Sequence, residues 1–460
     1  MLSSQYLHIF SAALFILSLR WMGEVKTSRY GNWSAILGMV TAIIATYLAF
    51  PVDHVPLMIG AAVIGTLIGI PIAMNVPMTA VPQQTAISHA FGSLSVALLG
   101  VAEYYQRAPH VDPFTMSVLS SEIILGFLTF SGSCIAFAKL QELIPGKPFV
   151  YKGSNVVSLS VLGVAVALAG DLVLHPGNQN LILAIIALAL LFGFLLVMSI
   201  GGADMPTVIA ILNSFAGISG AGLGFVLNSK ILVVAGTLDG ASGLILAIIM
   251  SEAMNRSFAN VLFGGFGAAP AGGSNGTGSN HQQRSVKSYL PEDVASLLDG
   301  ARLVVVVPGY GMAVAQAQHA VKDLATILES RDCKVRYAIH PVAGRMPGHM
   351  NVLLAEVQIP YSNLLEMDEV NPLFPEADMT IVVGANDVVN PAARTQTDSP
   401  LYGMPILDAD KSRSVVFIKR SMNPGFAGVD NELFYLPQTM MVFGDAKKVI
   451  TDITSALKKN

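Results

Sequence analysis

The first 260 residues alternate between long apolar runs and short polar stretches. A helix that crosses a membrane needs about 20 predominantly apolar residues, and nine runs are close to that length. They lie at residues 4–20, 33–50, 55–74, 83–102, 118–138, 155–174, 180–200, 205–227 and 231–251. The pattern predicts a polytopic α-helical membrane bundle of about nine spans.

Glycines recur at a spacing of four residues in three of the predicted spans. Small residues at this spacing let two helix backbones approach closely inside a membrane. The pairs are Gly65 with Gly69, Gly220 with Gly224, and Gly236 with Gly240. We interpret them as packing signals that carry no chemistry.

A different pattern begins near residue 289. Short apolar runs of the length of a strand alternate there with amphipathic helical stretches such as 312–329 and 445–458. The strand-like runs lie at residues 303–307, 335–339, 379–384 and 414–418. Such alternation is typical of a parallel sheet with helices on both faces, so we expect an α/β Rossmann-like domain.

The segment between the two patterns is rich in glycine, alanine, serine and asparagine up to about Gln283. It carries too little apolar surface to fold and is typical of a flexible linker. We therefore expect a transmembrane domain at residues 1–260, a linker at 261–288 and a nucleotide-binding domain at 289–460.

Composition and charge agree with this division. The 460 residues are 53% hydrophobic and only 12% charged, whereas a soluble globular protein has roughly 25% charged residues. Of the 56 charged residues, 19 lie in the first 260 positions and 37 in the last 200. The net charge of -4 and the absence of a basic stripe give no indication of nucleic-acid binding, and we expect no metal site.

The distribution of lysine and arginine predicts the orientation. Nine spans place the two termini on opposite sides, and the first span has no basic residue before it, which argues against a cleaved signal peptide. With the N-terminus outside, only Arg107 and Lys230 face outward. The predicted inner loops hold Arg20, Lys26, Arg29, Lys139, Lys147 and Lys152. The positive-inside rule therefore places residues 289–460 in the cytoplasm.

A glycine pair follows the first apolar run of the second half. Gly309 and Gly311 stand after the predicted strand and before a helix, where a dinucleotide pyrophosphate meets backbone amides and the positive helix end. Val314 occupies the position of the third glycine in the usual fingerprint, so the match is partial. An ordinary strand-to-helix turn remains the alternative.

The sequence favours NADP over NAD. An NAD site usually has an acidic residue for the ribose 2′-hydroxyl at the end of the second strand, but His340 and Pro341 stand there. Lys419, Arg420 and Ser421 follow another strand, and two cations with a hydroxyl suit a 2′-phosphate. A solvated basic strand end is the alternative.

Several longer motifs resemble the beta subunit of proton-translocating NAD(P) transhydrogenase, and they cover nearly the whole chain. They are GYGMAVAQAQ at 309–318, HPVAGRMPGHMNVLLAE at 340–356, GANDVVNPA at 384–392, KRSMN at 419–423, IGGADMP at 200–206 and AMNRSF at 253–258.

The resemblance implies that NADP(H) lies over the C-terminal edge of the sheet, reversed relative to ordinary Rossmann enzymes, and that Asp387 reports on its redox state. Many relatives have tyrosine where this chain has Phe426, which removes a hydroxyl contact. The implied binding residues are Gly309, Tyr310, Gly311, Met312, Ala313, Val314, Arg345, Asn386, Asp387, Lys419, Arg420, Ser421, Gly425 and Phe426.

In the membrane half, His89 stands in an otherwise uncharged span. An ionisable group inside a bilayer is a functional candidate, and histidine exchanges protons near neutral pH. The resemblance assigns His89 and Asn213 to the proton path. Asp204 and Arg256 lie at span boundaries, where relatives couple the two domains, although interfacial capping is the alternative.

Two further acidic residues, Glu122 and Asp239, also lie within predicted spans. Either one is a candidate for a direct proton role, although Glu122 lies near a helix end, where snorkelling to the interface is an alternative.

About 170 residues make one nucleotide domain and leave none for a substrate domain, so hydride must be exchanged with another polypeptide. The resemblance implies an alpha subunit that carries NAD(H), a dimer of alpha–beta units in membrane lipid, and a bacterial inner membrane. The predicted function is hydride transfer between NAD(H) and NADP(H) coupled to proton movement. The alternative is a transporter or channel that senses NADP(H) without catalysis.

Overall fold

A computed structural model describes residues 2–49, 54–146, 148–151, 153–201, 204–254, 258, 286–346, 348–397, 399, 401–423, 425 and 427–459. The chain divides into two compact units. The first contains the long N-terminal helices, and the second contains the residues from 286 onward. Most of the predicted linker, and Arg256 and Phe426, lie outside the described residues.

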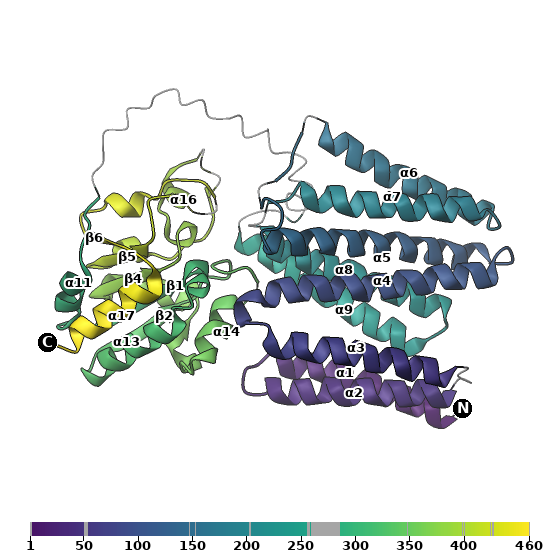
Figure 1. The fold of residues 1–460 in the computed structure, drawn as a ribbon, viewed down its shortest axis with the longest axis horizontal. Helices are drawn as coiled ribbons and strands as arrows, with labels where there is room; N and C mark the ends of the chain where they lie inside the picture. The colour runs from purple at the N-terminus through teal and green to yellow at the C-terminus, as the bar shows by residue number, and fades with distance from the viewer. Residues whose placement is uncertain are drawn as a thin grey trace. The chain divides into compact units, whose positions relative to one another are not determined.

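The first unit is built from long helices that run roughly along a common direction (Figure 1). They are α1 (Leu2–Met22), α2 (Ser28–Ala49), α3 (Val55–Asn75), α4 (Val81–Arg107), α5 (Pro113–Leu140), α6 (Ser154–Leu174), α7 (Gln179–Met198), α8 (Met205–Val226) and α9 (Lys230–Ala253), with a short 3-10 turn, η1 (Met78–Ala80), before α4. Eight of them, α2 to α9, are long and apolar enough to cross a membrane. The remaining predicted span, at residues 4–20, coincides with α1, a helix of 21 residues. The prediction of a polytopic helical bundle is confirmed.

The helices differ in how deeply they are packed. Most of α5 and α8 is buried inside the unit, and α4 packs against both of them. The described residues of α3 include none that is buried. The centre of the bundle is therefore the interface of α4, α5 and α8, where a buried polar group lies far from the lipid-facing surface.

One glycine pair, Gly236 with Gly240, and one member of a second pair, Gly224, lie at helix contacts, whereas a Cβ atom on Gly220 would have no neighbour within 4 Å among the described residues. A Cβ atom on Gly217 would lie 2.7 Å from Gly240 Cα, and one on Gly224 would lie 2.7 Å from the Val233 amide nitrogen, so α8 and α9 approach backbone to backbone. A Cβ atom on Gly65 or Gly69 of α3 would have no neighbour within 4 Å among the described residues outside the adjacent backbone of that helix. The packing prediction is thus confirmed for Gly224, Gly236 and Gly240, but not for Gly220 or for the pair in α3.

The second unit alternates strands with helices and short 3-10 turns. In chain order they are α11 (Pro291–Leu298), β1 (Leu303–Pro308), α12 (Tyr310–Val314), α13 (Gln318–Ser330), β2 (Lys334–Ala338), α14 (His349–Glu356), η4 (Tyr361–Asn363), β3 (Leu364–Leu365), α15 (Met367–Val370), η5 (Asn371–Glu376), β4 (Met379–Val383), η6 (Asp387–Val389), α16 (Ala392–Thr395), η7 (Ala409–Lys411), β5 (Val415–Lys419), η8 (Glu432–Tyr435), β6 (Thr439–Phe443) and α17 (Ala446–Leu457).

The six strands form one sheet in the order β3-β2-β1-β4-β5-β6, and every pair is parallel. Both faces are covered, so the valine-rich strands are buried throughout, and Figure 1 shows α13 and α17 in front of the sheet. Val304 of β1 pairs with Val335 on one side and Met379 on the other. The order reverses between β1 and β4, which is where doubly wound sheets bind nucleotides, at the carboxyl ends of the strands.

The chain that enters the second unit pairs with the edge of the sheet. The Tyr289 amide donates to the Met441 carbonyl and the Met441 amide donates to the Lys287 carbonyl, each at 2.9 Å, and Ser288 forms a parallel bridge with Met441. Residues 287–289 thus extend the sheet beyond β6.

Candidate functional site

The carboxyl ends of β1 and β4 bring two glycine turns together. The Gly309 amide donates to the Val383 carbonyl and the Gly311 amide donates to the Gly384 carbonyl, both at 2.9 Å. A Cβ atom on Gly311 would lie 2.7 Å from Gly384 Cα. Gly384 itself has φ +68°, which favours glycine. The contact explains why three glycines stand at this switch point.

These hydrogen bonds change the expected use of the glycine motif. The amides of Gly309 and Gly311 already have backbone acceptors, so in this conformation they are not donors for a pyrophosphate. The motif instead holds α12, which carries Tyr310, Met312, Ala313 and Val314, directly above the turn after β4. A dinucleotide at this edge would meet the surface that the two packed turns present.

The turn after β4 is held by amide side chains. The Asn431 side-chain amide donates to the Asn386 backbone carbonyl at 3.0 Å and to its Oδ1 at 3.3 Å. The Asn386 side-chain amide in turn donates to Asp387 Oδ1 at 3.1 Å. Asn386 and Asp387 are thereby fixed at the carboxyl end of the sheet before any ligand contacts them.

Asp387 also anchors the loop that follows β5. Its Oδ2 accepts a hydrogen bond from the Ala427 amide at 2.9 Å, and a Cβ atom on Gly425 would collide with the side chains of Asn386 and Asp387. The structure therefore brings Asp387 and Gly425 together. A change in the charge or position of the Asp387 carboxylate would alter the hydrogen bond that holds this loop.

The basic triplet after β5 divides into one packed and two exposed side chains. Lys419 Nζ donates to the Asn423 carbonyl and lies 4.6 Å from the centre of the Phe434 ring. Burial lowers the pKa of the Lys419 ammonium group, while the carboxylates of Asp387 and Asp430 oppose that shift. Arg420 and Ser421 are exposed. A phosphate would therefore reach Arg420 and Ser421 more readily than Lys419.

Arg345 lies over the aromatic ring that begins α12. Its guanidinium carbon is 4.1 Å from the centre of the Tyr310 ring, a cation–π distance. The Arg345 amide donates to Nδ1 of His349 at 3.0 Å, and the His349 ring packs edge-on to Tyr310. The structure brings Arg345 and Tyr310 together from two separate predicted motifs.

Two buried histidines brace this region in their neutral form. His340 accepts from the Val342 amide through Nδ1 and donates to the Pro405 carbonyl through Nε2 at 2.8 Å. Burial lowers the pKa of His340 to about 4. The pKa of His349 falls to about 4 as well, through burial and then through the positive charge of Arg345.

These shifts predict that the second unit loses stability in mild acid. Between the ordinary pKa of 6.5 and the folded value of about 4, the unfolded chain binds more protons than the folded one. The stabilising contribution of each histidine is complete above pH 6.5. It falls by about 1.4 kcal/mol per histidine for each pH unit between 6.5 and about 4, and it falls no further below that window. Urea unfolding of residues 286–460 at a series of pH values measures the slope. His340→Asn should flatten it, whereas His319→Asn, at an exposed histidine, should not. A stability that does not change across this window would contradict the prediction.

In the first unit, the structure joins two predicted residues that sequence reasoning kept apart. Asn213 of α8 donates to Asp239 Oδ1 of α9 at 3.1 Å, and Asp239 is close enough to His89 of α4 for a Coulombic interaction. His89 Nδ1 is buried and has no hydrogen-bond partner among the described residues. Three polar groups from three helices thus gather in one part of the bundle.

The coupling residues are only partly described. Asp204 is the residue before α8, which begins at Met205. Lys139, which we expected in an inner loop, instead lies buried in the last turn of α5. Its Nζ donates to the carbonyls of Val197, Met198 and Ile200 at 3.0, 2.9 and 2.6 Å. It ties α5 to the end of α7, just before the segment that contains Asp204.

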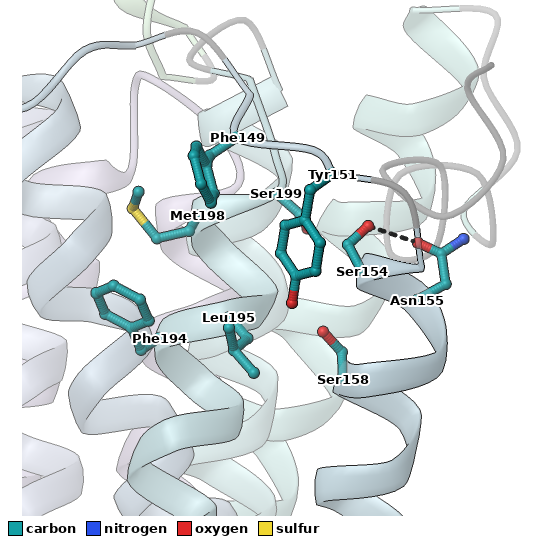
Figure 2. Close-up of a pocket in the computed structure, with 9 residues that line it drawn as sticks. All are labelled: Phe149, Tyr151, Ser154, Asn155, Ser158, Phe194, Leu195, Met198 and Ser199. Carbon is teal, nitrogen blue, oxygen red and sulfur yellow. Dashed lines mark hydrogen bonds between the residues drawn. The ribbon is translucent and has the colours of Figure 1, made fainter. Parts of the chain in front are cut away.

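Figure 2 shows a cavity of about 40 Å³ where α6 begins and α7 ends, too small for a nucleotide. Its walls carry aromatic and hydroxyl side chains, and none of the predicted site residues is among them. The lining residues are Phe149, Tyr151, Ser154, Asn155, Ser158, Phe194, Leu195, Met198 and Ser199.

Comparison with known proteins identifies the family. A family model described as NAD(P) transhydrogenase beta subunit matches residues 4–456. The chain belongs to the NAD(P) transhydrogenase beta subunit family. Two relatives from Rhodospirillum rubrum, each named NAD(P) transhydrogenase subunit beta, are 45% identical to it over 457 residues, which cover 98% of this chain and 98% of each relative. The match spans the membrane helices and the sheet domain, so the resemblance predicted from the motifs is confirmed.

Proposed function

We propose that this chain is the proton-conducting and NADP(H)-binding subunit of a proton-translocating transhydrogenase. Hydride passes directly between the nicotinamide of NADP(H), held by residues 289–460, and that of NAD(H), held by an alpha subunit. Proton movement through residues 1–260 drives the exchange. One elementary charge that crosses about 100 mV is worth about 2.3 kcal/mol, enough to shift a nucleotide redox equilibrium.

The observation that carries the proposal is the switch point of the sheet in a chain of this family. The turns after β1 and β4 meet there, and the basic triplet Lys419, Arg420 and Ser421 follows the next strand. In a doubly wound sheet, a dinucleotide binds across this reversal. An exposed arginine beside a serine supports recognition of a 2′-phosphate.

The loop at Gly425 supplies the link between the nucleotide and the rest of the enzyme. We propose that Gly425 and Phe426 close over NADP(H), together with Arg345 on the Tyr310 ring. Asp387 is hydrogen-bonded both to Asn386 and to this loop, so it would alter the conformation of the loop when the charge of the nicotinamide changes. Asp204 and Arg256 would carry that change to the membrane helices.

In the membrane, we propose that the proton path includes His89 and Asn213, with His89 as the group that takes and releases the proton. The hydrogen bond from Asn213 to Asp239 supports a shared path, because a carboxylate near a histidine stabilises its protonated form. The enzyme would act as a dimer of alpha–beta units in the lipid of a bacterial inner membrane, with residues 289–460 in the cytoplasm.

The assay is reduction of an NAD analogue by NADPH, measured in vesicles that contain this chain and its alpha subunit. A pH-sensitive dye inside the vesicles should report proton movement in step with hydride transfer. If the complex binds NADP(H) and moves protons but transfers no hydride, the chain is a transporter or channel that senses NADP(H), and the proposal is wrong.

A further inference from the structure

A second acidic group lies deep in the bundle, apart from the cluster at His89. Glu122 of α5 is 1% exposed, and neither of its carboxyl oxygens has a hydrogen-bond partner among the described residues. Its carboxyl group fills the notch left by Gly100 of α4, where any added Cβ atom would collide with it. Glu122 therefore does not snorkel to the membrane interface, because its side chain points into the centre of the bundle.

An unpaired carboxylate in such a place is costly. Removing an unpaired ionised group from water costs several kcal/mol, so the site favours a carboxylic acid over its anion. The other titratable or charged groups on the helices packed against it are distant or already bonded. In the described chain these are His89, Glu103, Tyr104, Tyr105 and Arg107 on α4, Cys134 and Lys139 on α5, and Asp171 on α6, whereas α7 and α8 carry none.

A cavity between α5 and α8 reaches the Glu122 side chain from one end of the bundle. It has a volume of about 380 Å³, lies between α5 and α8, and includes Glu122 in its wall. Phe114 at the start of α5 and Phe225 at the end of α8 line it and are exposed. Ser117 and Ser121 add hydroxyl groups along the α5 side. Glu122 lies about 14 Å along α5 from Pro113. The cavity touches the Glu122 side chain, whereas both carboxyl oxygens are buried on the opposite side, against Gly100.

Glu122 and His89 lie at different positions along the axis of the helix bundle. Glu122 faces Gly100 across the contact of α4 and α5, and His89 is eleven residues earlier in α4, or about 16 Å along its axis. That distance is too long for direct proton transfer. Ser93, Thr129 and Ser219 are buried hydroxyl residues of the same three-helix interface.

We propose that Glu122 is a proton-loading site that is distinct from the His89 cluster. The carboxyl group turns from the Gly100 notch toward the cavity and takes a proton from a hydronium ion there, so an O–H bond forms at the carboxyl oxygen as one breaks in the hydronium ion. In the release step that O–H bond breaks and the proton passes to a water molecule on the His89 side. The loading step rests on the proposed proton-translocating function. With the predicted topology, the cavity opens outside, so Glu122 receives the incoming proton first.

The first test detects the bound proton without any assay of activity. Dicyclohexylcarbodiimide adds to protonated carboxyl groups in apolar surroundings. In the complete membrane complex it should label Glu122, found by mass spectrometry of the peptide, and labelling should fall as the pH rises. Absence of labelling at acid pH would overturn the proposal. So would protection by sodium ions at constant pH, because the site would then bind a metal cation.

The second test measures coupling in vesicles. Glu122→Gln keeps the shape and cannot titrate, and it should slow proton-linked transhydrogenation at least tenfold while NADP(H) binding stays native. Glu122→Asp should restore part of the rate. Glu103→Gln removes a carboxylate near the same end of the bundle, one that pairs with Arg107 at 2.7 Å, and should have little effect.

A native coupled rate in Glu122→Gln would sink the loading site and leave the proposed function intact. If the unaltered complex shows no proton-linked hydride transfer, the proposed function fails instead, and the carbodiimide result alone decides whether Glu122 binds a proton.

Discussion

Replacement of His89 by alanine in the assembled enzyme is expected to slow proton-linked transhydrogenation by about a hundredfold or more, the usual loss when a proton-transferring group is removed. His89 is the single histidine of α4, so no other histidine of that helix can take over its role. Its Nδ1 is buried and has no hydrogen-bond partner among the described residues. The rate of NAD-analogue reduction by NADPH in vesicles, recorded with internal pH, measures the effect.

The matched control is His175→Ala. His175 is exposed at the end of α6 and pairs with Asp171 at 2.9 Å, so its loss should leave the rate close to native. Asn213→Ala should act in the same direction as His89→Ala, because it removes the hydrogen bond to Asp239. A His89→Ala enzyme that still moves protons at the native rate would exclude His89 from the path, and Asp239 would become the leading group in that cluster.

The second large effect is expected at the 2′-phosphate. Arg420→Ala should weaken NADP(H) binding about 10- to 100-fold, because a hydrogen-bonded pair with a charged group contributes about 1.5–3 kcal/mol. Binding of NAD(H), which lacks this phosphate, should not change. Titration calorimetry of residues 286–460 with the two nucleotides measures both affinities.

Arg413→Ala is the control for charge. Arg413 precedes the same strand, β5, at its opposite end, where it pairs with Asp378 at 2.9 Å, so its removal lowers the net charge equally without touching the proposed site. Equal affinities of the unaltered fragment for NADP(H) and NAD(H) would contradict the assignment of Arg420.

The fold was predictable wherever a local pattern carried it. The valine-rich runs that form β1, β4 and β5 predict buried parallel strands. The sequence analysis did not predict two of the strands, β3 and β6. β3 is only Leu364–Leu365 and exists through its pairing with Tyr337 and Ala338. β6 has methionines at its centre, and methionine lacks the β-branching that marks a strand.

The candidate site was predictable in its residue types but not in its contacts. The glycine motif indicates a turn at Gly309, yet the acceptors of the Gly309 and Gly311 amides are the carbonyls of Val383 and Gly384 at the end of β4, and no local pattern encodes that. The pairing of Asn213 with Asp239 depends in the same way on the close packing of α8 and α9. Lys139 was misplaced because a lysine near a helix end usually reaches water, whereas here backbone carbonyls of α7 satisfy it.

The short segment at Lys287–Tyr289 has a consequence for how the sheet domain behaves in solution. By bonding to Met441, it occupies hydrogen-bonding groups of β6 that would otherwise form an open edge, and open edges recruit strands from other molecules. A fragment that begins after Tyr289 would expose β6 and self-associate, while one that begins at residue 286 stays monomeric. Residues 287–289 therefore also protect the sheet domain against aggregation, because they cover the edge of β6.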